Sequence, residues 1–301
     1  MSLLVTGSIG IDTVETPRGR AEDALGGSAV YFALAASLFT PVRMVGVVGE
    51  DFDLGRLKPL ADRGVDTRGV EVRQGARTFR WHGKYVGAMN EAETVDVRLN
   101  VLAERGAPLP PEFADSRFVF LANTHPALQR EFARRLSHAE LLVCDTMNLW
   151  IENEPHELHK TLSIVHGLVL NEGEARLLTQ KTNLVTAGRE ILKLGPRFVI
   201  IKKGEHGSML VSQDDLFLMP PYPTENVVDP TGCGDSFAGG TMGYIAAQGR
   251  CDRATLRAAM ARGSVVGSYV LESFSIEALK RITAADVDKR LDDLRALARF
   301  E

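Results

Sequence analysis

The sequence lacks the features that mark secreted and membrane proteins. Cysteine is scarce: the 301 residues include only Cys144, Cys233 and Cys251, and none of them forms a C-x-x-C pair. Three widely separated cysteines cannot build the disulfide framework of a small secreted domain. No apolar run approaches the roughly 18 residues of a membrane span, and the N-terminal MSLLVTGSIG has no basic region. We therefore expect a cytoplasmic protein without a membrane partner.

An excess of charge of one sign is also missing. The chain has 35 Lys and Arg against 39 Asp and Glu, a formal net charge of −4. A nucleic-acid-binding protein usually carries a basic excess, so we expect no nucleic-acid partner. Hydrophobic residues make up 45% and charged residues 25% of the chain. These are proportions of ordinary globular proteins, which excludes fibrous and disordered classes.

Short apolar runs alternate with amphipathic segments along the chain. The expected strands are residues 3–6, 42–48, 118–121, 141–144, 168–170, 198–201 and 209–211, and the expected helices include residues 29–39, 129–136, 172–180 and 184–194. Continuous apolar strands separated by helices indicate parallel strands that are covered on both faces. We predict one α/β domain over residues 1–301, a doubly wound and mostly parallel sheet flanked by helices. The part after Gly234 is expected to be mostly helical, ending in a helix over residues 282–300.

The pattern changes to a period of two between residues 70 and 101. Phe79, Trp81 and Tyr85 alternate with polar residues, and Val95 and Val97 do the same further on. This alternation is typical of strands with one buried face and one wet face. We predict a small antiparallel β insertion that acts as a lid; an ordinary surface hairpin is the alternative.

Residues 229–235 read DPTGCGD and precede an apolar helical stretch. A tight loop of this kind exposes the amides of Gly232, Cys233 and Gly234 at the positive end of a helix dipole, where an anion binds well. Asp235 stands beside that position, and a carboxylate next to an anion site is unfavourable unless it handles a proton or a metal ion. The pattern indicates phosphoryl transfer with a base; a Gly-rich turn with Asp235 as a helix cap is the alternative.

Two other segments also follow predicted strands. NEGE places Asn171 and Glu174 on one side of a starting helix, and IKKGEHGS places Gly204 and Gly207 where a ligand can approach the backbone closely. Ligands of open α/β sheets collect at the carboxyl ends of the strands. These segments and DPTGCGD are therefore expected to meet in one site.

Together these segments resemble the ribokinase-like, or PfkB, family of carbohydrate and nucleoside kinases. DPTGCGD matches the family's D-[TP]-[TP]-G-x-G-D signature at each defining position, NEGE matches its N-x-x-E element, and IKKGEHG resembles its G-x-x-G strand end. GSIGID and LGGSA resemble its two N-terminal substrate elements. The resemblance runs from Gly7 to at least Val270 and implies a ribokinase-like fold with lid segments at approximately residues 11–25 and 70–101.

The resemblance also implies an activity and a set of site residues. The activity is transfer of the γ-phosphoryl group of ATP to a hydroxyl of a small sugar, with Asp235 as the catalytic base and the amides of Gly232, Cys233 and Gly234 as the anion hole. Asn171 and Glu174 would organise Mg²⁺ through water. The other nucleotide-side positions are Lys202, Gly204, Gly207, Asp229 and Thr231. The positions implied for the acceptor are Asp12, Gly26, Gly27, Tyr31, Arg80, Asn123 and Asn148.

Several points stay open in the sequence. The acceptor could instead be a nucleoside, of the adenosine type, since Trp81 and Trp150 could stack on a base if both face the site. A ligand sensor without catalysis, built on the same fold, is an alternative from another class. Relatives are often activated by a monovalent cation. The loop after Val270 does not clearly resemble their cation-binding segment, so activation of this protein by such a cation stays open. The polar edge of the lid could pair two copies into a homodimer.

Two departures from the family pattern bear on chemistry. The DTMNLW segment at residues 145–150 resembles a D-P-N-x-R element without its arginine, which argues against an acidic or phosphorylated sugar. Cys233 stands where relatives often have alanine. We expect it to serve as a small residue, although a thiol at a helix N-terminus can be acidified and made reactive.

Overall fold

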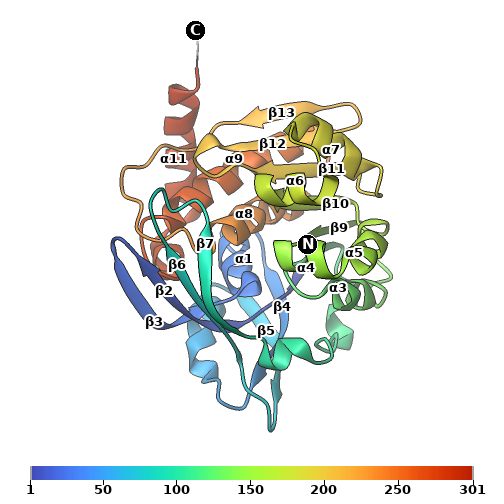
Figure 1. The fold of residues 1–301 in the computed structure, drawn as a ribbon, viewed down its shortest axis with the longest axis vertical. Helices are drawn as coiled ribbons and strands as arrows, with labels where there is room; N and C mark the ends of the chain where they lie inside the picture. The colour runs from blue at the N-terminus through green and yellow to red at the C-terminus, as the bar shows by residue number, and fades with distance from the viewer. Residues whose placement is uncertain (1, 300–301) are drawn as a thin grey trace.

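The computed structural model describes residues 2–299, so Phe300, at the end of the expected last helix, lies outside the described residues. The larger of its two sheets has the strand order β13-β12-β11-β10-β9-β8-β1-β4-β5 (Figure 1). The strands from β11 to β5 run parallel, and β12 and β13 continue the sheet antiparallel. Their bounds are β1 Leu3–Thr6, β4 Val42–Gly49, β5 Val65–Arg73, β8 Phe118–Leu121, β9 Leu141–Asp145, β10 Gly167–Asn171, β11 Phe198–Lys202, β12 Ser208–Ser212 and β13 Leu216–Met219.

Helices cover both faces of this sheet, which explains why its strands are apolar throughout. Successive strand residues point to opposite faces: Leu3 and Val5 enter one buried cluster, and Leu4 enters the other. The first cluster is covered by α1 Ser28–Ala36, α2 Lys58–Asp62, α8 Cys233–Gln248, α9 Arg253–Val270, α10 Glu277–Arg281 and α11 Ala284–Leu297. The second is covered by α3 Pro126–Ala133, α4 Asn148–Asn153, α5 Pro155–Leu162, α6 Glu172–Thr179 and α7 Leu184–Leu192. The prediction of a doubly wound, mostly parallel sheet is confirmed.

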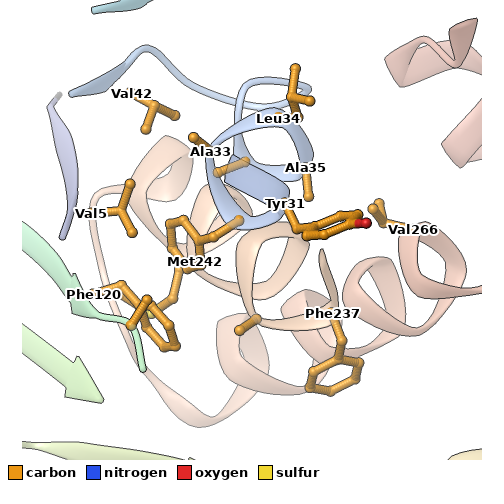
Figure 2. Close-up of a cluster of buried hydrophobic side chains, with 14 of the residues drawn as sticks. Val5, Tyr31, Ala33, Leu34, Ala35, Val42, Phe120, Phe237, Met242 and Val266 are labelled. Carbon is orange, nitrogen blue, oxygen red and sulfur yellow. The ribbon is translucent and has the colours of Figure 1, made fainter. Parts of the chain in front are cut away.

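Close packing of α1 on α8 fixes the part of the core beneath the DPTGCGD segment. Figure 2 shows this cluster, with Tyr31 on α1, Phe237 and Met242 on α8, and Phe120 on the sheet. A Cβ atom on Gly239 would lie 2.4 Å from the backbone oxygen of Phe32, so α8 could not approach α1 this closely with a side chain there. The lack of a side chain at Gly239 therefore lets α8 pack directly against α1.

The smaller sheet has the strand order β3-β2-β6-β7 and lies to one side of the large sheet (Figure 1). It joins the two segments expected in the lid: β2 (Gly10–Thr16) and β3 (Gly19–Gly26) pair with β6 (Phe79–Tyr85) and β7 (Ala92–Arg98). The β2–β3 and β6–β7 pairs are antiparallel, whereas β2 and β6 are parallel. Every residue of β7 is exposed.

The second lid segment is shorter than the expected residues 70–101. Residues 70–73 belong to β5 of the large sheet, where the ladder with β4 continues to Gly49 and Arg73. At the other end, Val101 is 1% exposed and belongs to a short 3-10 helix, Asn100–Ala103. A period of two is shared by lid strands and by a half-covered edge strand, so the pattern could not separate them.

Within the described residues, no helix combines the length and the hydropathy needed to cross a membrane.

Candidate active site

The DPTGCGD segment forms a tight turn that opens α8. Gly232 adopts φ 77°, a left-handed conformation that favours glycine. A Cβ atom here would lie 2.3 Å from the Tyr31 ring, so the turn packs too closely on α1 for any side chain. The buried Asp229 carboxylate accepts a hydrogen bond from the Thr231 amide at 2.8 Å. Backbone shape, packing and this hydrogen bond together hold the turn in place.

Three backbone amides at the start of α8 remain available for an anion. The Cys233 amide donates to the carbonyl of Pro230 at 3.1 Å, which removes it from the expected anion hole. No hydrogen bond among the described residues takes up the amides of Gly232, Gly234 or Asp235. The first amides of a helix lack carbonyl partners and carry the positive end of its dipole. The amides free to bind an anion are therefore those of Gly232, Gly234 and Asp235, whereas the expected set had that of Cys233.

The Asp235 carboxyl lies in the first turn of α8, next to these amides. Burial raises its pKa to about 6, and the Lys202 ammonium opposes that rise. The Lys202 amine is close to the helix start, because a Cβ atom on Gly234 would be 2.6 Å from Nζ. Near neutral pH the group is a carboxylate whose proton affinity suits a general base.

Lys202 is the cation shared by three acidic side chains. It ends β11, and its charge lowers the pKa of Asp235, Glu174 and Asp145 against the effect of burial. Asp145 ends β9 and is 5% exposed, and its Oδ1 atom has no hydrogen-bond partner. Burial and then the Asp235 charge raise the Asp145 pKa well above its usual range. A buried carboxylate oxygen without a partner in the protein is free to interact with a ligand atom.

Asp145 was not among the residues implied by the sequence. Its signal was present, since it is the first residue of the DTMNLW segment and follows a buried strand of the same sheet. Only the arrangement of β9, β10 and β11 as neighbours brings it close to Lys202 and Glu174. Gln129 supports this edge, because its Nε2 atom donates to the carbonyls of Leu121 and Asp145 at 2.9 and 3.2 Å.

The NEGE segment forms a capping box at the start of α6. The Asn171 side chain accepts from the Glu174 amide, and the Glu174 side chain accepts from the Asn171 amide, each at 2.7 Å. These bonds use Oδ1 of Asn171 and Oε2 of Glu174. The amide nitrogen of one and the second carboxylate oxygen of the other remain for a ligand. The pair is therefore a helix cap that also presents polar atoms to the site.

The donor set at this edge fits a hydrated magnesium ion. No three His, Cys, Asp or Glu side chains of the described residues are grouped so that they could hold a metal ion by themselves. Mg²⁺ usually keeps several waters and takes one or two carboxylates together with substrate phosphates. Asp145, with its unpartnered oxygen, and Glu174 supply carboxylates of this kind.

The two glycines of the IKKGEHGS segment are needed for different structural reasons. Gly204 adopts φ 53° and has open space around it, apart from Asn90 of the β6–β7 connection. Gly207 adopts φ 79°, and a Cβ atom there would lie 2.1 Å from the carbonyl oxygen of Met219. Gly207 is thus required by the passage of the chain after β13, and its role in close ligand approach stays a prediction. Gly204 remains on the open side.

The N-terminal elements bring Asp12 into the interior beneath the lid. Asp12 is 5% exposed, and its Oδ1 atom has no hydrogen-bond partner. Burial, together with the charges of Asp229 and Asp235, raises its pKa to about 7. A Cβ atom on Gly26 would lie 1.8 Å from its Oδ2 atom, so this glycine makes room for the carboxylate. The unpartnered oxygen suits a ligand hydroxyl, which can donate to it.

Gly27 and two serines join these N-terminal elements. Gly27 adopts φ 102° at the start of α1, where a Cβ atom would be 2.4 Å from the carbonyl oxygen of Ser8. Ser8 and Ser28 exchange hydrogen bonds, with each hydroxyl accepting from the other residue's amide at 2.9 and 3.2 Å. No sequence pattern predicted this reciprocal pair, because the two serines lie twenty residues apart.

Four side chains implied for the acceptor lie in unexpected surroundings. Tyr31 is 2% exposed and packs under Gly232, which is a supporting position. Arg80 pairs with Asp23 at 2.9 Å and is 40% exposed. Asn123 accepts from Trp150 Nε1 at 2.9 Å and donates to Met147 at 3.0 Å, so its amide holds neighbouring side chains. Asn148 is exposed at the start of α4.

The lid presents an aromatic face to the site. Asp12 pairs with Trp81 across the β2–β6 ladder, so both side chains lie on one face, which Gly83 and Tyr85 share by alternation. The Tyr85 hydroxyl lies 3.3 Å from Thr231 Oγ1 of the anion-binding turn, which shows that this face is the inner one. The half-buried Trp81 indole lies over Gly83, because a Cβ atom there would be 1.9 Å from the ring.

The Cys233 thiol is not activated at the helix start. Burial and the charges of Asp229 and Asp235 hold its pKa well above the usual range, with only Lys202 acting in the opposite direction. A high pKa keeps the sulfur protonated and a poor nucleophile. Its amide is also used, so Cys233 serves the turn through its small size.

Comparison with known proteins shows to which class of enzymes this architecture belongs. The sheet, the small lid sheet and the acidic residue at the helix start define a ribokinase-like kinase. The family model for the pfkB family carbohydrate kinases matches residues 3–280, and the chain belongs to that family. A cytidine kinase of Thermococcus kodakarensis is 31% identical over 255 residues, which cover 81% of this chain and 88% of that protein.

Solved structures share the fold at low sequence identity. The nucleoside kinase of Burkholderia thailandensis in complex with inosine superposes with a TM-score of 0.79 and 21% identity, covering 98% of this chain and 99% of that one. Ribokinase of Cryptococcus neoformans in complex with ADP gives a TM-score of 0.79 and 20% identity, covering 96% and 99% of the two chains. These similarities confirm the ribokinase-like fold.

Proposed function

We propose that this kinase transfers the γ-phosphoryl group of ATP to a hydroxyl group of a nucleoside. The observation that carries the phosphoryl transfer is the Asp235 carboxylate beside three free amides at the start of α8. Donors stabilise charge on the transferred group, and a neighbouring base takes the proton of the attacking hydroxyl. A ligand sensor needs no such base, so the arrangement favours the enzyme.

Each side chain has a role in the proposed reaction. Asp12 holds the acceptor by accepting from another of its hydroxyls. The attacking hydroxyl forms a bond to the γ-phosphorus while its own proton passes to Asp235. The bond from phosphorus to the β–γ bridging oxygen breaks, and ADP leaves with that electron pair. The amides of Gly232, Gly234 and Asp235, with the Lys202 ammonium, stabilise the charge on the phosphoryl oxygens. Magnesium, held near Asp145 and Glu174, would neutralise phosphate charge when bound.

The inner face of the lid favours a nucleoside over a plain sugar as acceptor. Trp81 lies on the same face as Asp12, so a sugar hydroxyl at Asp12 would place an attached base near the indole. Stacking of a base on an aromatic side chain is worth about 1–3 kcal/mol. The cytidine kinase relative is consistent with this choice. The simple sugar expected from the sequence is the second candidate.

An acceptor panel with a matched pair of variants tests this proposal. ADP release is measured with cytidine, inosine and ribose, for the unaltered chain, Trp81→Ala and Lys84→Ala, whose side chain is exposed on the opposite face of β6. We expect a nucleoside to be the better substrate and Trp81→Ala to raise its KM about 5- to 100-fold, with little change for ribose or for Lys84→Ala. An equal loss with ribose contradicts the stacking role. If none of the acceptors in the panel supports ADP release, the proposed reaction is contradicted.

A further inference from the structure

Tyr85, the last residue of β6, directs its hydroxyl to the anion-binding turn. The side chain is 9% exposed, and Thr231 Oγ1 donates a hydrogen bond to the phenolic oxygen at 3.3 Å. Thr231 is itself held in the turn, because its amide donates to Asp229 at 2.8 Å. The Tyr85 hydroxyl therefore has a fixed place beside the residue that precedes Gly232.

The phenolic proton of Tyr85 has no acceptor of its own. Thr231 supplies the proton of the hydrogen bond that the two residues share, and no other hydrogen bond among the described residues involves the Tyr85 hydroxyl. A phenol can donate one hydrogen bond while it accepts another, so this group still has a donor to offer. Leaving a buried donor unpaired costs free energy, which a ligand oxygen would recover.

The surroundings keep this hydroxyl neutral. Burial raises the pKa of Tyr85 above its usual range, and the charges of Asp229 and Asp12 act in the same direction. A phenolate at this position would be repelled by these carboxylates, whereas the neutral phenol donates a hydrogen bond without adding negative charge. The group is therefore suited to contact an anion in a region that already contains several acidic side chains.

One face of β6 joins the acceptor side of the site to the phosphoryl side. Asp12 pairs with Trp81 across the β2–β6 ladder, and Tyr85 follows on the same face four residues later. At about 3.3 Å per residue, Tyr85 lies about 13 Å further along the strand than Trp81. The turn that Tyr85 contacts carries the free amides of Gly232 and Gly234. The hydroxyl thus lies where the phosphoryl group is expected, away from the indole.

We propose that the Tyr85 hydroxyl donates a hydrogen bond to the phosphoryl group during its transfer. The amides of α8 and the Lys202 ammonium approach this group from the large sheet and its helices, and Tyr85 adds a donor from β6. Charge spreads over the equatorial oxygens of a transferring phosphoryl group, so a donor placed there stabilises the transition state. Tyr85 is a catalytic residue in this scheme, since it contacts the reacting group. The inference rests on the proposed function, because it needs a phosphoryl group at this turn.

Replacing Tyr85 with phenylalanine removes the donor and keeps the ring. Tyr244→Phe is the matched control, since Tyr244 lies further along α8 with its ring against Arg262 and Phe39. ADP release is measured with whichever of cytidine, inosine and ribose is the best acceptor. We expect kcat of Tyr85→Phe to fall about 10²-fold, with both KM values within about threefold, because the lost interaction belongs to the transition state. The control should keep its kcat.

Binding of a transition-state mimic gives a second readout. Calorimetry measures the affinity for ADP with aluminium fluoride, magnesium and the acceptor, and separately the affinity for a non-hydrolysable ATP analogue with magnesium. In Tyr85→Phe the affinity for the mimic should fall by about the same factor as kcat, while the affinity for the analogue stays unchanged. Thermal midpoints close to that of the unaltered chain show that both variants are folded.

The remaining outcomes separate the role of Tyr85 from the proposed function. Unchanged kcat in Tyr85→Phe overturns the inference and leaves the proposed function intact. A parallel loss of affinity for the ATP analogue also overturns it, since Tyr85 would then only hold the turn in shape. If the unaltered chain releases no ADP with any of the acceptors, both the proposed function and the inference are contradicted.

Discussion

Asp235 combines two environments that usually exclude each other. It is buried enough for its pKa to rise to about 6, yet it lies beside an ammonium group that favours its charged form. Burial alone would push a carboxyl further toward the neutral acid, which cannot accept a proton. Lys202 opposes that rise, so the group is ionised at neutral pH and still holds a transferred proton.

Replacing Asp235 with asparagine should remove the base and leave the shape of the site unchanged. We expect turnover to fall about 10²- to 10⁴-fold while nucleotide binding stays within a few-fold of its original value, because the amides of the turn are retained. Steady-state kinetics and calorimetric titration with an ATP analogue measure the two quantities. Unchanged turnover would contradict the assignment of Asp235 as the base.

The pH dependence provides an independent readout of the same group. The proton-accepting form lies above the pKa, so kcat/KM of the unaltered chain should fall as the pH drops through about 6. The residual activity of Asp235→Asn should lose this limb. Stability has the opposite sign: the folded-state pKa is raised above 3.8, so the contribution of this group is complete below about pH 4 and is lost as the pH rises through 6.

At the scale of the element, β6 shows how a strand serves two environments. Its odd-numbered residues, Trp81, Gly83 and Tyr85, form the face that contacts the site, and its even-numbered residues are polar. The Trp81 ring occupies the space that a side chain on Gly83 would fill. Its Nε1 atom donates a hydrogen bond to Thr94 Oγ1 of β7 at 3.2 Å. The orientation of the indole thus depends on its neighbours in the sheet.

Gly83→Ala should therefore displace the indole without removing it. The new Cβ atom would stand 1.9 Å from the ring, a distance that forces the flexible side chain to move. We expect a several-fold rise in KM for the nucleoside and a smaller change in kcat, measured by ADP release. Combining Gly83→Ala with Trp81→Ala should add little, because the ring that the methyl group displaces is already absent. Fully additive effects would show that Gly83 matters for another reason.

At the scale of the whole molecule, β7 is one of the two edge strands of the lid sheet, and β3 is the other. All its residues are exposed, and two large apolar side chains, Val95 and Val97, are 56% and 48% exposed. An unpaired edge strand with apolar side chains is a template for pairing with a second chain. The homodimer through the lid stays a prediction, and this edge is the surface that it concerns.

Light scattering on the purified chain tests the dimer. We expect twice the mass of one chain at micromolar concentrations, and a shift to single chains for Val95→Lys, because a charge on an edge strand opposes pairing. Leu149→Lys, on the exposed side of α4, is the control and should leave the mass unchanged. A mass of one chain at every concentration contradicts the prediction.

The sequence predicted the large sheet well and the borders of the lid less well. Continuous apolar runs marked the buried parallel strands, since only strands covered on both faces carry them. Residues 70–73 were misplaced because an edge strand of the large sheet shows the same alternation as a lid strand. The site segments after β10, β11 and before α8 were found because their glycines and carboxylates follow strands in the chain.

What the sequence by itself determined is local: the alternation of strands and helices, the turn before α8 with Asp235 in the first helical turn, and the Asn171 and Glu174 cap. These follow from backbone conformation and hydrogen bonds within a few residues. The tertiary structure alone decided which amides stay free, that the Lys202 charge acts on the Asp145 carboxyl, and that Asn90, between β6 and β7, reaches Glu205 after β11. These depend on contacts between segments far apart in the chain, whose distances are set when the strands pair and the core packs.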